Sequence, residues 1–169
     1  MFGIGDTIVY GTSGVCKIVE ICPRTVDHKE IMYYVLKPVY DDHSTIYCPV
    51  DNHKVRFQKV LTRAELRALI QKIPGTPVEW EENDQQRRER FNAVLKHGGR
   101  GELIQLLRTL YAHREERLRA GKKAHTADER LMKEAENILH GEFAYVLGIQ
   151  PEEVAPFIRE ELQKIDAAV

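Results

Sequence analysis

The residues of this chain best suited to chemistry are cations, and they are concentrated in one block. Residues 87–123 hold eleven Lys or Arg against four Asp or Glu, a formal charge of +7 in a chain whose net charge is -1. Residues 1–60 are balanced, while residues 61–86 and 124–169 carry -2 and -6. Such a block is typical of a surface that contacts phosphate groups. Helices whose cations pair with nearby acids give the same count, so a solvated helix face remains an alternative.

The one tryptophan, Trp80, lies just before this block and is surrounded by four acidic residues between positions 79 and 84. An aromatic ring beside cations can wedge between bases or stack on them. The nearby carboxylates repel phosphate, which favours the alternative that Trp80 anchors the preceding linker to the helices. The candidate DNA-binding residues are Trp80, Arg87, Arg88, Arg90, Lys96, Arg100, Lys122 and Lys123.

The sequence contains no recognisable catalytic motif. The phosphate-binding G-x-x-x-x-G-K-[ST], a dinucleotide-binding G-x-G-x-x-G after a strand, and the zinc motif H-E-x-x-H are all missing. Ser13 and Ser44 lack the G-x-S-x-G setting of a nucleophile. The glycines around Arg100 lie between two helical stretches, where they favour helix caps. We therefore expect no catalytic residue, and an enzyme is the least favoured class of function.

Cysteine and histidine usage gives no indication of a metal or a cofactor. The cysteines Cys16, Cys22 and Cys48 form no C-x-x-C pair, and their odd number leaves one over in any disulfide scheme. We expect reduced thiols, and the seven histidines lack metal-ligand spacing. No apolar run is long enough to cross a bilayer, and the N-terminus does not resemble a signal peptide. The sequence thus predicts a cytoplasmic protein without a cofactor.

The first sixty residues are predicted to form short strands. Runs rich in β-branched and aromatic residues alternate with turn residues. Alternation within the second run predicts Val19 and Ile21 on one face and Cys16 and Ile18 on the other. Five short strands fit a small Tudor- or SH3-like barrel that closes its sheet. The predicted strands cover residues 7–10, 15–21, 31–37, 44–48 and 55–57.

After residue 60 the apolar spacing becomes helical. Thr62 and Glu65 form a capping box, and the helix that follows should end before a Pro/Gly-rich linker at residues 74–77. Four to five amphipathic helices follow, one opened by a capping box at Thr126 and the last by Pro151. The expected fold class is α+β, with a β-barrel before a compact all-helical domain. The expected domains are residues 1–60, a connecting helix and linker at 61–80, and residues 81–169.

Several motifs in this order occur together in a known family. The N-terminal set is Met1-Phe-Gly-Ile-Gly-Asp-Thr-Ile-Val-Tyr10, Gly14-Val15, Tyr33-Tyr-Val-Leu-Lys37 and Pro49-Val-Asp-Asn52. The helical half adds residues 101–110 and 135–144. Together they resemble the CarD/CdnL family of bacterial transcription regulators, whose N-terminal module also occurs in the transcription-repair coupling factor. The resemblance covers nearly the whole chain.

This resemblance implies a barrel that binds the β subunit of bacterial RNA polymerase by pairing an exposed sheet edge. Arg24 and Val26 match a pair that faces the polymerase, and Tyr47 stands where many family members carry an arginine. The helical domain is implied to lie at the upstream edge of the promoter bubble, where a tryptophan wedges into the minor groove. Asp84 occupies the usual place of that tryptophan, and Trp80 stands four residues, about one helical turn, earlier.

The sequence therefore predicts a transcription regulator that binds polymerase and stabilises the promoter open complex, with promoter DNA as its second partner. The alternative is a polymerase-binding adaptor with little or no DNA contact, which the acidic residues around Trp80 favour. A free barrel edge also leaves self-association open.

Overall fold

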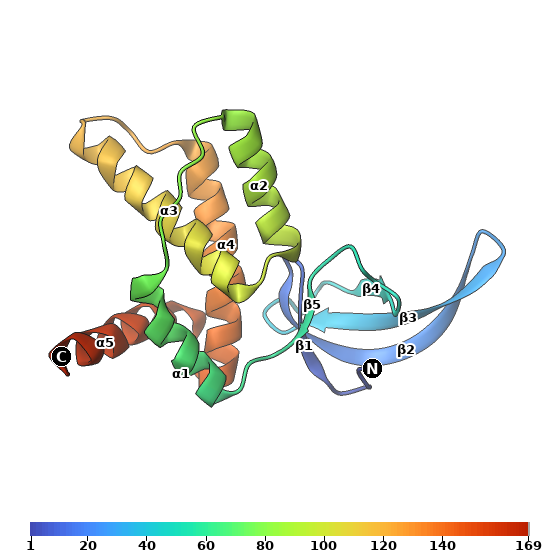
Figure 1. The fold of residues 1–169 in the computed structure, drawn as a ribbon. Coiled ribbons are helices and arrows are strands. Elements are labelled where there is room, and N and C mark those ends of the chain that lie inside the picture. Colours follow the sequence, from blue (N-terminus) through green and yellow to red (C-terminus); the bar gives the residue numbers. More distant parts are fainter. Residues whose placement is uncertain (169) are drawn as a thin grey trace.

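The computed structural model describes residues 1–168 as an antiparallel sheet followed by a group of helices (Figure 1). The strand order is β4-β3-β2-β1-β5. The strands are β1 (Thr7–Tyr10), β2 (Gly14–Val26), β3 (Lys29–Pro38), β4 (Ile46–Pro49) and β5 (Phe57–Lys59). The helices are α1 (Arg63–Lys72), α2 (Asp84–His97), α3 (Arg100–Arg119), α4 (Thr126–Leu147) and α5 (Val154–Ala167), with 3-10 turns η1 (Ile73–Gly75) and η2 (Pro151–Glu153).

The predicted fold class, a small β domain before an all-helical domain, is confirmed, but the sheet does not close. β4 and β5 are the two edge strands and do not pair with each other. β5 has only three residues, and its Lys59 carbonyl accepts a 2.7 Å hydrogen bond from Arg100 of α3. This edge therefore meets the helical domain, and β4 keeps an unpaired edge.

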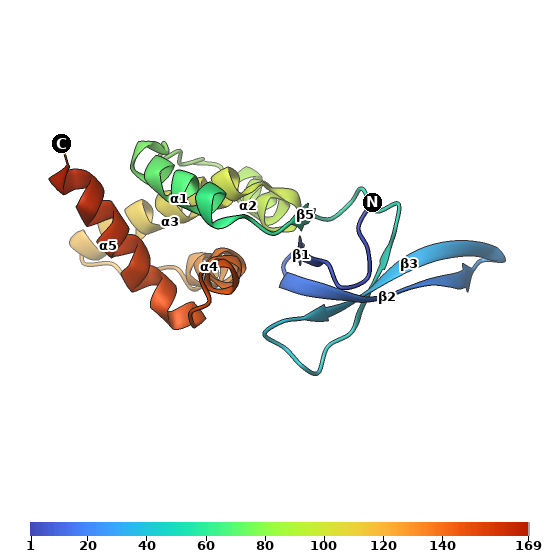
Figure 2. The same cartoon turned by 90° about the horizontal axis from the view of Figure 1, so that it is seen from below.

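The predicted alternation along the second strand is wrong beyond Ile18. The β2–β3 register shifts between Ile18 and Glu20, which marks a β-bulge at Val19. The extra residue reverses the alternation, so Ile21 packs with Cys16 and Ile18 in one apolar cluster while Val19 is 42% exposed. Beyond the bulge, the distal parts of β2 and β3 extend from the sheet as a two-stranded ribbon, away from the helices (Figures 1 and 2).

One of the three predicted helix starts needs correction. The Thr62 capping box is present at α1. At α4, however, the N-cap is His125, whose carbonyl accepts the Glu129 N–H at 3.0 Å, so Thr126 is already inside the helix and cannot cap it. Pro151 begins the 3-10 turn η2, which leads into α5. The other helix positions agree with the apolar spacing.

The larger apolar cluster joins the sheet to the helices. Val9 and Val15, neighbours in the β1–β2 pairing, belong to the same buried cluster as residues of α2, α3 and α4. α1 contributes Leu66 and Ile70 to this cluster. We propose domain boundaries at residues 60 and 80. Because α1 shares the buried cluster of α2, α3 and α4, we group it with the helical domain. None of the helices in residues 1–168 is long and apolar enough to cross a membrane.

Candidate interaction surfaces

The outer face of the sheet collects the three residues that the resemblance assigned to polymerase binding. Arg24 and Val26 of β2 lie opposite Ile31 and Lys29 of β3, and Tyr47 of β4 lies opposite Val35 of β3. Opposed residues share a face, and residues two apart along a strand share it too. Arg24, Val26 and Tyr47 therefore point to the same side of the sheet.

The structure brings Arg24 and Tyr47 into direct contact. The guanidinium carbon of Arg24 lies 3.6 Å from the centroid of the Tyr47 ring, a cation–π stack that spans β3. Tyr47 and Val26 remain 43% and 41% exposed. Sequence reasoning missed Tyr33, which lies on the same face opposite Cys22, although the alternation within residues 31–37 could have placed it there.

The edge of β4 borders this face. β4 pairs with β3 from Leu36–Ile46 to Tyr33–Pro49, and no strand within residues 1–168 pairs with its other side. An unpaired edge presents backbone N–H and C=O groups that can accept another strand. The outer face and the β4 edge together form one surface, which we call the sheet-edge surface; its named side chains are Arg24, Val26, Tyr33 and Tyr47.

Trp80 has both ring faces covered. His113 of α3 stacks on it with ring centroids 3.6 Å apart and an interplanar angle of 11°, and the guanidinium carbon of Arg87 lies 4.3 Å from the ring centroid. Burial lowers the pKa of His113 below its usual 6.5. Trp80 is partly buried against the main core. This arrangement favours the anchoring role and leaves no open ring face for stacking on a base.

The linker that carries Trp80 is extended. Residues 76–82 form no helix, and Asn83 is the N-cap of α2, with its side chain accepting the Gln86 N–H. Because the segment from Trp80 to Asn83 is not helical, Trp80 does not lie one helical turn before Asp84 on the same helix. The linker is held by the Glu79 N–H, which donates to Thr109 Oγ1 at 3.2 Å.

Three of the predicted DNA-binding arginines are engaged within the protein. Arg87 pairs with Asp84 at 2.6 Å and donates to the Glu81 carbonyl at 2.9 Å. Arg90 pairs with Glu79 at 3.0 Å. Arg100 lies in the contact between the sheet and the helices. Among residues 1–168, the predicted cations in no salt bridge are Arg88, Lys96, Lys122 and Lys123.

Arg100 is a structural residue of the domain junction. Its guanidinium binds both carboxylate oxygens of Glu142, at 2.8 and 2.5 Å, and also donates to Gln58 Oε1 at 2.8 Å. Glu142 is 1% exposed and accepts the Leu61 N–H at 2.9 Å. This network links β5, α3 and α4, and we therefore remove Arg100 from the candidate DNA contacts. Sequence reasoning missed Glu142, whose only signal is an acid within an apolar helix face.

Arg56 is a second junction residue that the sequence did not reveal. The side chain is 4% exposed and donates to three carbonyls: Gly98 at 2.6 Å, Gly11 at 2.9 Å and Val94 at 2.7 Å. Two of these carbonyls belong to the C-terminal end of α2, where a cation is favoured. Burial, with the nearby Arg100 charge, lowers the pKa of Arg56 from its usual value. Arg56 thus fastens the sheet to α2.

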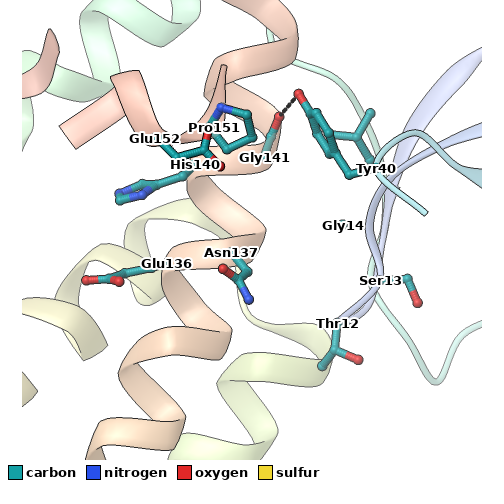
Figure 3. Close-up of a pocket in the computed structure, with 11 residues that line it drawn as sticks. Thr12, Ser13, Gly14, Tyr40, Glu136, Asn137, His140, Gly141, Pro151 and Glu152 are labelled. Atoms are coloured by element: carbon teal, nitrogen blue, oxygen red, sulfur yellow. Dashed lines mark hydrogen bonds between the residues drawn. The ribbon is translucent and has the colours of Figure 1, made fainter. Parts of the chain in front are cut away.

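A cleft of 460 Å³ lies between the β1–β2 turn and α4 (Figure 3). Tyr40 crosses it and donates its hydroxyl to the Gly141 carbonyl at 3.1 Å. Burial raises the pKa of Glu136 and lowers that of His140, which both line this cleft. No group of three His, Cys, Asp or Glu side chains within the described residues is placed to hold a metal ion.

A comparison with known protein families identifies the N-terminal part. The family model for the CarD-like/TRCF RID domain matches residues 2–61, which contain the whole sheet and the sheet-edge surface. Domains of this family interact with RNA polymerase and are non-catalytic interaction modules. The N-terminal domain of this chain therefore belongs to the CarD-like/TRCF RID family of RNA polymerase-interacting domains.

Proposed function

We propose that this chain is a transcription regulator that binds the β subunit of bacterial RNA polymerase through its sheet-edge surface and stabilises the promoter open complex through its helical domain. A cytoplasmic location, where polymerase works, is part of this proposal. The observation that carries it is the exposed Arg24–Tyr47 stack beside the unpaired edge of β4, in a domain whose family interacts with polymerase.

The β4 edge supports binding by strand addition. An incoming strand would form main-chain hydrogen bonds along β4, and alternate side chains on both strands would give specificity. Tyr47 lies on this edge strand, and the aromatic ring with the stacked guanidinium of Arg24 offers a large contact of low conformational freedom. The tyrosine takes over the contact area of the family arginine, and Arg24 keeps a positive charge beside it.

The DNA part of the proposal depends on the cations that remain available. Arg88 and Lys96 lie on α2, and Lys122 and Lys123 lie in the connection between α3 and α4. All four are exposed. Contacts from such residues to phosphates bind DNA without reading its sequence and weaken with salt. We propose these four residues, rather than Trp80, as the principal DNA contacts.

A polymerase-binding adaptor with little DNA contact is the second candidate. The salt bridges of Arg87, Arg90 and Arg100 and the stack of His113 and Arg87 on Trp80 favour it, because half of the predicted DNA-binding residues make contacts within the protein. The two candidates differ in salt dependence. Phosphate contacts lower log K by about 0.9 per neutralised phosphate for each tenfold increase in salt, whereas strand addition depends much less on salt.

The deciding experiment measures binding of the full chain to a purified fragment of the RNA polymerase β subunit at low and high salt. We expect salt-resistant binding that R24E weakens and that K17E, an exposed charge reversal nearer the start of β2, leaves unchanged. The proposal is contradicted if the wild-type chain does not bind the fragment at either salt concentration. It is also contradicted if R24E and K17E bind with equal affinity. Sedimentation of the free chain shows whether the same edge pairs with a second copy.

A further inference from the structure

The loop between β4 and β5 is fixed against the C-terminal end of α2 by three hydrogen bonds, each to a backbone carbonyl. The Arg56 N–H donates to the Lys96 carbonyl at 2.9 Å, and His97 Nδ1 donates to the Lys54 carbonyl at 2.7 Å. The Arg56 side chain adds the bond to Gly98 described above. Figure 1 shows this end of α2 reaching the sheet. Residues 54–56 of the N-terminal domain and residues 96–98 of the helical domain thus form one continuous surface.

This surface carries basic residues from both domains, with one lysine from each. His53 and Lys54 come from the loop, and Lys96 and His97 come from the last turn of α2; all four are exposed. No salt bridge within residues 1–168 involves Lys54 or Lys96. Within residues 87–123, the exposed cations in no salt bridge are Arg88, Lys96, Lys122 and Lys123.

The line continues along α2 to Arg88, with the neutral Asn92 between Lys96 and Arg88. Arg88, Asn92 and Lys96 are exposed and stand four residues apart, so they follow one side of the helix. Eight residues of helix span about 12 Å. Because each strand of duplex DNA carries a phosphate every ~3.4 Å along the axis, this distance corresponds to about three to four base pairs. The loop cations extend the line past the end of the helix.

An anionic backbone fits this surface better than a protein does. Protein interfaces are centred on apolar or aromatic anchors. None of the exposed large apolar side chains of residues 1–168 lies between positions 50 and 58 or between 84 and 99. A narrow line of cations without an apolar centre matches the phosphates of one DNA strand, which supply negative charge at regular intervals.

We infer that Arg88, Lys96 and His97 of α2 and His53 and Lys54 of the N-terminal domain form one phosphate-contacting track on duplex DNA. The inference rests on the proposed DNA contact and extends it to the domain that the family match assigns to polymerase interaction. The N-terminal domain therefore contacts the DNA backbone itself, through a loop separate from its proposed polymerase surface.

The test uses the full chain and a fluorescently labelled promoter duplex, with affinity measured by anisotropy over a range of salt concentrations. K54A and K96A each remove one charge of the track, and K72A removes one exposed charge at the end of α1 as a matched control. The Lys54 and Lys96 side chains make no hydrogen bond in the described structure, so both variants should stay folded, which circular dichroism checks.

We expect K54A and K96A each to weaken binding at low salt and to reduce the slope of log K against log salt by about 0.9, while K72A matches the wild type. If K54A behaves like K72A while the wild type binds DNA, the track inference is overturned and the proposed function stands. If the wild type shows no salt-dependent binding at the lowest salt, the proposed DNA contact fails as well.

Discussion

Two arginine–aromatic stacks, one in each domain, differ in what surrounds them. On the sheet, Arg24 covers Tyr47 at 3.6 Å, and the tyrosine stays 43% exposed. In the helical domain, Arg87 covers Trp80 at 4.3 Å, and His113 covers the opposite face. Arg87 also pairs with Asp84, whereas Arg24 has no salt bridge among the described residues.

The comparison teaches that residue types alone do not separate an interface from a structural anchor. A cation over an aromatic ring is attractive in both settings. Only the stack with an uncovered surface and an uncompensated charge can offer that attraction to a partner. By this criterion we propose the Arg24–Tyr47 stack as the binding element, whereas the Trp80 stack holds the linker to α2 and α3.

The largest effect is expected at the domain junction, where Arg100 pairs with the buried carboxylate of Glu142. R100M leaves the buried Glu142 carboxylate without its cation, which should cost about 3–5 kcal/mol of unfolding free energy. The double variant R100M/E142L should recover most of this loss, because an apolar pair of similar size removes the stranded charge. Urea denaturation measures both. An R100M variant as stable as the wild type would show that Arg100 is available for other contacts.

The next largest effect is expected at the stack of Trp80 with Arg87 and His113. W80A removes a partly buried ring held on both faces and should cost about 2–3 kcal/mol of unfolding free energy, below the 3–5 kcal/mol of a fully buried aromatic residue. The same variant should keep wild-type affinity for the polymerase β-subunit fragment. A stable W80A with weakened open-complex stabilisation would restore Trp80 as a DNA contact and remove the distinction between the two stacks.

Substitution in the Arg24–Tyr47 stack should affect binding more than stability. Y47A should change the unfolding free energy by no more than about 0.5 kcal/mol, as for most surface substitutions. It should weaken binding to the β-subunit fragment roughly tenfold, the loss of an interface anchor of ~1.4 kcal/mol. Y111A removes a tyrosine of similar exposure, 40%, from α3 and serves as the matched control. Equal affinities of the two variants would place Tyr47 outside the interface.

The smallest effect is a pH dependence of the unfolding free energy that comes from His113 in the Trp80 stack. Burial lowers the pKa of His113 in the folded chain, so the unfolded chain binds this proton first as pH falls. Stability should therefore decrease as pH drops through about 6.5 towards the lower folded pKa. H113Q should reduce this slope in urea midpoints measured from neutral to mildly acidic pH. Part of the slope should remain, because burial also lowers the pKa of His140.

Local patterns were sufficient to predict much of the fold. Most strand and helix positions follow from apolar spacing and turn residues within a few positions, and the capping box at Thr62 depends on four adjacent residues. The exception is β2, which runs to Val26, five residues past its predicted end. The bulge at Val19 was not predictable, because it depends on how β2 pairs with β3. The helix start at Thr126 failed since the choice of N-cap between adjacent residues is set by the chain entering α4.

The candidate site was less predictable than the fold because charge counts do not show pairing. Arg88 and Arg100 look alike in the sequence, yet Arg100 meets Glu142, a residue 42 positions away. Arg56 has no distinguishing sequence pattern, and three carbonyls from distant segments surround it. Arg24, Val26 and Tyr47 came only from family resemblance, and the strand register is what places them on one face.

The shared core of the two domains has a consequence for how the chain is made. Val9 and Val15 are buried in a cluster that includes residues of α4. The Glu142 carboxylate of α4 also accepts a hydrogen bond from the Leu61 N–H. At 5–20 residues per second, the roughly 80 residues that separate β5 from Glu142 take about 4–16 s to synthesise. During that interval the newly made sheet leaves the ribosome with an uncovered apolar face, so its final stability is acquired late in translation.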